Sequence, residues 1–287
     1  MKQKIGIVTD EASDLPEEIV NKYNIGIARF KVDLQNLINI PGNIYQKIRE
    51  AEKMGIPNTI KTSQPSINEF LSVFKEKLKD FEEIICITMS SKVSGTYNSA
   101  IQAKKFLQKE LQEKVHVFDS LNGSSGEGLV VLKSISLIKE NLEIKKIIEK
   151  LKEGISSFKL LGVYEKPKWL ESSGRVPRFI PALMKEAEKM SIKPIFGMKS
   201  GQLKVVGIKR NIKDLSSALF EEFEKATKKI KSPISVAITH ADNIPQAERL
   251  KELINNLNNA KVLFTNLTCI PLGGHIGPGS LIISWKE

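Results

Sequence analysis

Residues 82–100 read EEIICITMSSKVSGTYNSA, which joins an apolar run to a polar loop and the beginning of a helix. The apolar part, EIICITM, is short and rich in isoleucine, a pattern that favours a strand buried on both faces of a parallel sheet. The part that follows, from Ser90 to Ala100, consists largely of small hydroxyl and amide side chains. Such side chains either cap the first turn of a helix or bind a ligand.

The same order of strand, loop and helix recurs along the first half of the chain. KIGIVTD, ending at Asp10, precedes the helical SDLPEEIVNKY, and KVHVFDS contains Asp119 near its end, before the helix of GSSGEGLVVLKSISLIKEN. A helix after KTSQPS has Ser66 and Glu69 spaced as a capping box. Its apolar stripe consists of Ile67, Phe70, Leu71, Phe74 and Leu78. Alternation of this kind predicts an α/β protein with a mostly parallel sheet.

The second half has a different order of strand and helix patterns, which predicts a second domain with a mixed sheet. KPIFGMKSGQLKVVGIKR is typical of a hairpin that turns at Ser200 and Gly201. Strand and helix patterns follow, and the late strands KVLFTNL and LIISWKE complete the chain. We therefore expect two α/β domains, an N-terminal one over residues 1–155 and a C-terminal one over residues 156–287.

Composition narrows the classes of partner. The formal net charge of the 287 residues is +11, but lysines alternate with glutamates, as in EKLKDFEE, which is typical of solvated helix faces. No basic patch with interleaved aromatics appears, so we expect no nucleic-acid partner, although a basic regulator of DNA or RNA remains a rival hypothesis. A docking surface for an acidic protein is another interpretation of the charge. No apolar run reaches the roughly 18 residues of a spanning helix, and the two cysteines lie in apolar runs, so we expect a cytoplasmic protein without disulfides.

Three loops combine small polar residues with a position where ligands bind in α/β folds. They are KTSQPS with Thr62 and Ser63, SSKVSGTYNSA with Ser94 and Gly95, and LGGHIGPGS with His275. Helix amino termini offer free amides and a partial positive charge, so two of them near one point can hold a carboxylate or a phosphate. Neither a Walker sequence nor a dinucleotide fingerprint is present. The loops therefore predict an anion site without the usual nucleotide signature.

Taken together, KTSQPS, SSKVSGTYNSA, FDS, SGRV and HIGPG, with VTDEASDLP before them, resemble the motifs of the DegV family of fatty-acid-binding proteins. The resemblance extends from about Lys4 to near residue 287. It implies two α/β domains with a ligand tunnel between them, in which one long-chain fatty acid such as palmitate lies. By motif, it implies that Thr62, Ser94 and His275 hold the carboxylate, and we place Ser63 and Gly95 at the same site.

The resemblance also implies a binding protein rather than an enzyme, with no metal and no cofactor other than the bound fatty acid. The resemblance also implies a partner. Several bacterial members of this family are the lipid-carrying subunit of a fatty acid kinase, so we expect a separate ATP-binding subunit. Transient membrane contact during lipid exchange is a further expectation. An alternative from the residues themselves is a serine hydrolase built from Ser94, His275 and Asp119, although no GxSxG elbow is present.

The sequence departs from the family pattern at three places. Glu11 follows Asp10 where the family has a serine, and Ser173 with Gly174 precedes Arg175 where a glycine pair is usual. The segment 33–43 is shorter and less polar than expected, which leaves the shape of the tunnel open.

Four further residues are candidates outside the head-group set. Asp10 and Asp119 each close a strand, so they either support the site or cap the next turn. Arg175 and Arg210 are candidates for contact with a partner or a phosphate product, with surface solvation as the simpler interpretation.

Overall fold

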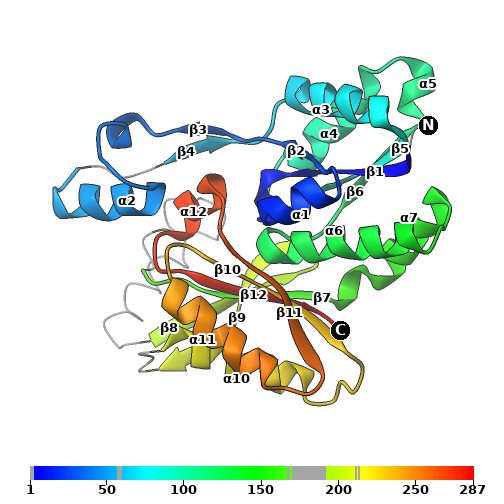
Figure 1. The fold of residues 1–287 in the computed structure, drawn as a ribbon. Coiled ribbons are helices and arrows are strands. Elements are labelled where there is room, and N and C mark those ends of the chain that lie inside the picture. The colour runs from blue at the N-terminus through cyan, green and yellow to red at the C-terminus, as the bar shows by residue number, and fades with distance from the viewer. Residues whose placement is uncertain (1–2, 57–59, 167–168, 170–191, 211, 213) are drawn as a thin grey trace.

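The first half of the chain is built on a parallel four-stranded sheet, sheet A. The computed structural model describes residues 3–56, 60–166, 169, 192–210, 212 and 214–287 (Figure 1). The strands run in the order β2-β1-β5-β6, and every neighbouring pair is parallel. Their bounds are β1 Gln3–Asp10, β2 Gly26–Ala28, β5 Phe81–Thr88 and β6 Val115–Asp119. The predicted mostly parallel sheet is therefore confirmed.

Helices cover both faces of sheet A, which explains the apolar run in β5. Ile84 and Cys86 pack with α3 and α4 on one face, while Ile85 and Ile87 pack with α6 and α7 on the other. Because successive strand residues point to opposite faces, a strand covered on both sides needs apolar residues throughout. The helices of this half are α1 Glu17–Lys22, α3 Ile67–Asp80, α4 Thr96–Lys105, α5 Lys109–Gln112, α6 Ser124–Lys139 and α7 Ile144–Gly154.

At the start of α3, the structure confirms one of the two hydrogen bonds of the predicted capping box. The Ser66 hydroxyl accepts a hydrogen bond from the Glu69 amide at 3.1 Å, as expected of an N-cap. The Glu69 carboxylate instead accepts from the amide of Arg29, at 3.1 Å, and so ties the helix to the segment after β2. The predicted apolar stripe of α3 lies against the sheet, with Phe70, Phe74 and Leu78 buried.

The second half forms a mixed six-stranded sheet, sheet C, in the order β11-β10-β12-β7-β8-β9. Only β10 and β11 pair in parallel, and the other four pairs are antiparallel. The strands are β7 Phe158–Val163, β8 Ile192–Lys199, β9 Gln202–Arg210, β10 Ile234–His240, β11 Ala260–Leu267 and β12 Leu281–Lys286. The β8–β9 hairpin turns at Ser200 and Gly201, both with positive φ, as predicted.

Helix α6 lies between the two sheets. One of its sides packs on sheet A and the other meets Ala237 and Phe264 of sheet C. The Ser125 hydroxyl bonds the Ser284 hydroxyl of β12 at 2.9 Å. Helices α10 Leu215–Thr227 and α11 Ile244–Asn255 cover the opposite face of sheet C (Figure 1). Most of α6 is buried, including nearly all of its first half, which is why serines and glycines there combine with aliphatic residues.

A segment of the first half reaches over to the second, and we call it the arm. It consists of β3 Lys31–Asp33, the short helix Gln35–Leu37, α2 Ile44–Lys53 and β4 Lys61–Ser63. β3 and β4 form a two-stranded antiparallel ribbon, and Figure 1 shows it projecting from sheet A with α2 at its far end. The apolar side of α2, with Tyr45 and Ile48, packs in one cluster with Leu160 and Phe196 of sheet C.

The two sheets draw their strands from separate parts of the chain, since β6 ends at Asp119 and β7 begins at Phe158. The division between residues 1–155 and 156–287 stays a prediction, and the arm crosses it. Among the helices that the structure describes, none combines the length and apolar character needed to cross a membrane.

Candidate functional site

The loop after β5 is held in place by two aspartates at the carboxyl ends of neighbouring strands. Asp10, at the end of β1, accepts from the amide of Met89 at 2.8 Å. Asp119, at the end of β6, accepts from the amides of Ser91 at 3.2 Å and Leu121 at 2.9 Å. Both aspartates therefore support the loop that leads to Ser94, and Asp10 also caps the next turn through the Ala12 amide.

Thr62 and His275 meet directly, although 213 residues separate them in sequence. Thr62 lies on β4, opposite Val32 of β3, so the ribbon of the arm fixes its position. His275 lies in α12, Ile270–Ile276. The Thr62 Oγ1 and His275 Nε2 atoms are 2.7 Å apart, and both side chains are partly exposed. Two of the three predicted carboxylate donors are thus brought together by the fold.

The glycines around His275 are required by close packing. A Cβ at Gly273 would collide with the Tyr45 hydroxyl, and one at Gly274 would lie 2.9 Å from Ile60 Cβ. Gly277, which ends α12, has φ +76 and ψ 159, a conformation that is essentially limited to glycine. The Tyr45 hydroxyl donates to the carbonyl of Thr268 at 2.6 Å and so anchors the arm just before α12.

Ser94 caps the start of α4 within its own loop. Its hydroxyl lies 2.7 Å from Thr96 Oγ1 and accepts from the Thr96 amide at 3.3 Å. The KTSQPS and SSKVSGT loops meet through Gln64, whose amide would lie 2.5 Å from a Cβ at Gly95 and whose Nε2 donates to Ser99 Oγ at 3.4 Å. Gly95 thus allows the two loops to approach each other.

Ser63, the remaining residue that we placed at the site, lies at the end of β4. Its side chain is exposed to solvent.

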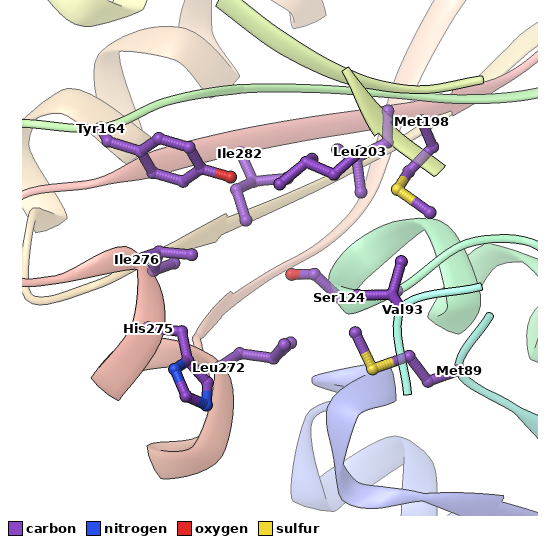
Figure 2. Close-up of a pocket in the computed structure, with 12 residues that line it drawn as sticks. Met89, Val93, Ser124, Tyr164, Met198, Leu203, Leu272, His275, Ile276 and Ile282 are labelled. Atoms are coloured by element: carbon purple, nitrogen blue, oxygen red, sulfur yellow. The ribbon is translucent and has the colours of Figure 1, made fainter. Parts of the chain in front are cut away.

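A narrow apolar cavity extends from His275 between the two halves of the protein (Figure 2). Methionine, valine, leucine and isoleucine supply eight of its twelve lining residues. The cavity itself holds about 70 Å³, and the unfilled space reaches about 600 Å³ when its open end is included. The lining residues are Met89, Val93, Gly123, Ser124, Leu160, Tyr164, Met198, Leu203, Leu272, His275, Ile276 and Ile282. Its apolar walls suit the hydrocarbon part of a ligand, and its few polar groups include the His275 ring.

Sequence reasoning missed Asp14, which links the first half of the chain to the segment before α12. Its carboxylate accepts from the Ser124 hydroxyl at 2.6 Å and from the Cys269 amide at 2.7 Å. The Ser124 hydroxyl also lies 2.7 Å from Thr239 Oγ1 of β10. Burial raises the pKa of Asp14 to about 7, although both of these hydrogen bonds favour its ionised form. The sequence SDLP indicated only a turn before a helix at this place.

Two more carboxyl groups are buried close to the start of α6. Burial raises the pKa of Asp10 to about 7 and the pKa of Glu127 well above its usual value. Glu127 accepts from the Thr9 hydroxyl at 2.9 Å through one carboxyl oxygen, and no described group meets the other. A carboxyl group that is so deeply buried, with so few donors among the described residues, favours the protonated form.

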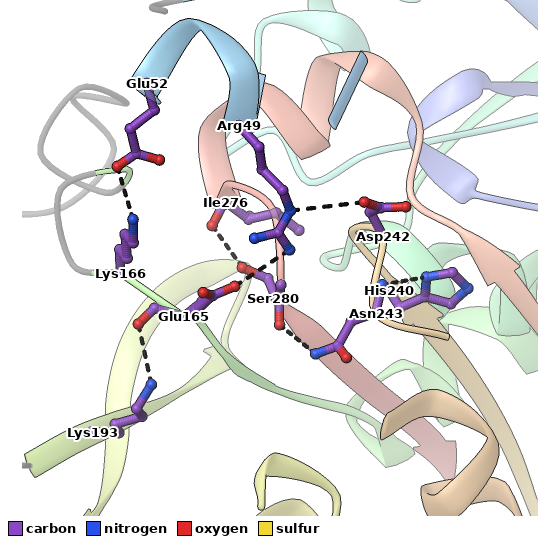
Figure 3. Close-up of polar contacts among 11 residues, drawn as sticks. Arg49, Glu52, Glu165, Lys166, Lys193, His240, Asp242, Asn243, Ile276 and Ser280 are labelled. Carbon is purple, nitrogen blue, oxygen red and sulfur yellow. Dashed lines mark hydrogen bonds and ion pairs between the residues drawn. The ribbon is translucent and has the colours of Figure 1, made fainter. Parts of the chain in front are cut away.

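Ion pairs at the rim of the second half also hold the arm (Figure 3). Arg49 of α2 lies 3.5 Å from Glu165 and 3.8 Å from Asp242, and Lys166 donates to Glu52 at 2.8 Å. All of these side chains are partly exposed, so each pair adds little stability. They connect α2 to the segments that follow β7 and β10, and they add to the buried contacts of Tyr45.

The remaining candidates lie elsewhere or outside the described residues. Arg210 is exposed at the end of β9 and does not line the cavity. Arg175 lies outside the residues that the structure describes.

The geometry counts against the hydrolase triad of Ser94, His275 and Asp119. The Ser94 hydroxyl bonds Thr96, the His275 Nε2 atom bonds Thr62, and the Asp119 carboxylate accepts from backbone amides. A triad needs the base to reach the nucleophile and the acid to reach the base.

Within the described parts of the chain, no group of three or more histidine, cysteine, aspartate or glutamate side chains is placed to hold a metal ion. Both cysteines are free thiols, as predicted.

Comparison with known proteins gives consistent results along nearly the whole chain. The family model described as "Uncharacterised protein, DegV family" matches residues 4–287. A DegV domain-containing protein of Staphylococcus aureus strain COL is 30% identical over 277 residues, which cover 96% of each chain. A second one, from Caldanaerobacter subterraneus, is 28% identical over 292 residues and covers 99% of each chain.

Solved structures share the fold. A stearic-acid-binding protein from Eubacterium ventriosum matches with a TM-score of 0.85 and 21% identity, covering 100% of this chain and 98% of its own. A Thermotoga maritima protein whose structure reveals fatty acid binding function matches with a TM-score of 0.78 and 25% identity, over 99% of both chains. With its family model spanning residues 4–287 and its two-sheet fold shared with these proteins, the chain belongs to the DegV family.

Proposed function

We propose that this protein binds one long-chain fatty acid, with the carboxylate at Thr62 and His275 and the acyl chain in the cavity beyond them. The observation that carries the proposal is an apolar cavity with a hydroxyl–imidazole pair at its edge. Relatives with the same fold bind fatty acids, which supports the same ligand class here.

The polar pair suits a carboxylate that must be held and later released. When His275 Nε2 carries the proton, it donates to Thr62 Oγ1 and leaves the Thr62 hydroxyl proton for an anion. Ser94 adds a second hydroxyl at the start of α4, one residue before the N-cap Gly95. Hydroxyls, a helix start and one imidazole stabilise a partly desolvated carboxylate without a full counter-charge.

Burial of the hydrocarbon chain supplies most of the affinity. Each methylene transferred from water contributes about 0.8 kcal/mol, so some fifteen carbons offer roughly 12 kcal/mol before the costs of association. The walls that receive the chain come from both halves, with Met89 and Val93 on one side and Met198 and Leu203 on the other (Figure 2). A chain bound there would contact both halves of the protein at once.

The same site is suited to presenting the carboxylate to a second protein. Thr62 and His275 are partly exposed, so the head group lies near the surface while the chain is buried. We propose that a separate ATP-binding subunit phosphorylates the bound acid there. The loaded protein with ATP alone is expected to form no acyl phosphate, and formation without a second protein would contradict this division of labour.

The first experiment is lipid analysis of the purified protein. Native mass spectrometry and solvent extraction are expected to find one fatty acid taken from the expression host. Absence of lipid, together with no uptake of added palmitate or oleate, would overturn the proposal.

The second experiment tests the head-group residues. Thr62→Ala combined with Ser94→Ala is expected to weaken palmitate binding at least tenfold without unfolding, since each lost charge-assisted hydrogen bond contributes about 1.5–3 kcal/mol. Ser91→Ala is the matched control, because Ser91 lies in the same loop with an exposed side chain. Undiminished binding by the double variant would show that the carboxylate is held elsewhere.

A further inference from the structure

A second cavity lies next to the first one, where two strands of sheet C separate. β7 and β8 pair only over Leu161–Val163 with Ile195–Gly197. Beyond these pairs the strands diverge, and a cavity of about 620 Å³ opens along residues 158–161 of β7 and residues 197–201 of the hairpin. Trp285, Val206 and Leu161 give it an apolar interior, and Lys159, Lys199 and Glu287 are charged groups in its lining.

Leu160 and Met198 are the two residues that line both cavities. Each lies one residue beyond the last β7–β8 pair, Leu160 before Leu161 and Met198 after Gly197. Leu160 is buried in the core around the arm, whereas Met198 is only partly buried. In the view of Figure 2, Met198 lies at the corner of the first cavity opposite His275. The two side chains therefore lie between the two cavities, and Met198 lies across the first cavity from His275 in Figure 2.

We propose that Met198, backed by Leu160, is the gate that sets the longest acyl chain this protein binds, and that the second cavity receives the end of longer chains when the gate moves. The proposal rests on the proposed function, since it concerns the tail end of the same fatty acid. Methionine suits a movable partition, because its unbranched side chain has three rotatable bonds and adapts its shape to its neighbours. The unpaired stretch of β7 and β8 provides the passage without breaking a ladder hydrogen bond.

The proposal applies to Met198 and not to its partner in the β8–β9 hairpin. Leu203 faces Met198 across the β8–β9 pair, yet it lines only the first cavity. Removing Leu203 would widen the first cavity, whereas removing Met198 would join the two. Because Met198→Ala and Leu203→Ala are similar in size and location, a comparison of the two distinguishes a gate at Met198 from a general loosening of the cavity wall.

The test measures the affinities of palmitic, stearic, arachidic and behenic acids for the full-length protein and three variants. Met198→Ala is expected to raise affinity for behenic relative to palmitic acid by roughly tenfold or more for each two methylenes newly buried. Met198→Phe is expected to change the same ratio in the opposite direction, and Leu203→Ala is expected to leave it within about threefold of the unchanged protein.

An unchanged ratio in both Met198 variants, or the same shift in Leu203→Ala, would overturn the gate while the binding of palmitic acid still supports the proposed function. Failure of every acid to bind the unchanged protein would instead overturn the proposed function, and the gate with it. Met198→Phe keeps the test decisive if Met198→Ala does not fold, because filling the partition and opening it predict opposite shifts.

Discussion

Replacing Tyr45 with phenylalanine removes one hydroxyl from the contact between the arm and the segment before α12. The Tyr45 side chain is fully buried, and its hydroxyl donates to the Thr268 carbonyl at 2.6 Å. The aromatic ring stays in the variant, so the packing with Ile48 and Phe196 is kept. The variant loses the hydroxyl that donates to the carbonyl of Thr268, a residue that is only 2% exposed.

The expected loss follows from that burial. A buried carbonyl left without its donor costs about 1–3 kcal/mol, and no cavity term is added because the ring remains. Tyr45→Phe should therefore lower the free energy of unfolding by about 1–3 kcal/mol. Because Thr268 lies two residues before α12, the variant should also let His275 move relative to Thr62 and weaken palmitate binding.

Urea unfolding followed by far-UV circular dichroism measures the first effect, and palmitate titration measures the second. Tyr164→Phe is the matched control for the unfolding measurement, since Tyr164 is also buried and no hydrogen bond from a described group reaches its hydroxyl. The control should change stability by less than about 0.5 kcal/mol. A stable Tyr45→Phe variant, or an equal loss in Tyr164→Phe, would refute the view that this hydrogen bond anchors the arm.

Two further predictions concern stability. Burial raises the pKa of Asp10 and Asp14 from 3.8 to about 7, so the folded state keeps protons that the unfolded chain releases, and the contribution of the two aspartates to stability is full below about pH 4 and is lost as the pH rises through 7. Burial also raises the pKa of Glu127 well above its usual value, so its contribution falls in the same direction as the pH rises. Urea unfolding across this range should show a shallower fall for Glu127→Gln, and an unchanged slope would count against its protonation. Gly277→Ala should cost about 1–3 kcal/mol or more, because φ is +76 and the new methyl would meet a tryptophan ring. Gly154→Ala, where a Cβ meets open space, should be near neutral in the same unfolding assay, and similar results for the two glycines would contradict this reasoning.

The sequence predicted the structure best where the contacts of a residue depend on residues close to it in the chain. β5 and α3 could be predicted because burial on two faces or one face leaves a pattern in consecutive residues. The Ser66 cap was visible for the same reason, since it depends on an amide three residues away. Glu69 was misjudged because its partner, the Arg29 amide, lies 40 residues distant.

The site was predictable in its chemistry but only partly in its geometry. Donor-rich loops pointed to Thr62 and His275, and the family resemblance grouped them, whereas spacing alone could not place residues 213 apart at 2.7 Å. Asp14 was missed because its partners lie more than 100 residues later, at Ser124 and Cys269. Strands of three residues, such as those of the arm, are too short for a periodic signal. A signal did exist for the start of α2, where Asn43 and Gln46 form a full capping box.

The arm makes the order of synthesis matter for folding. During synthesis the Tyr45 hydroxyl lacks its acceptor until Thr268 leaves the ribosome, 223 residues later. At ordinary rates of translation this delay is roughly 10–45 s. During that time Leu160 and Phe196 can already pack on the apolar side of α2, but Ile276 and Ile282 of the same cluster have not been made. β12, which lies between β10 and β7, arrives later still, so until residues 281–286 emerge the sheet exists only as two separate pieces. The nascent chain therefore carries an unpaired strand edge and an incompletely covered helix face together, and molecular chaperones that shield such surfaces should act on it before the last strand is made.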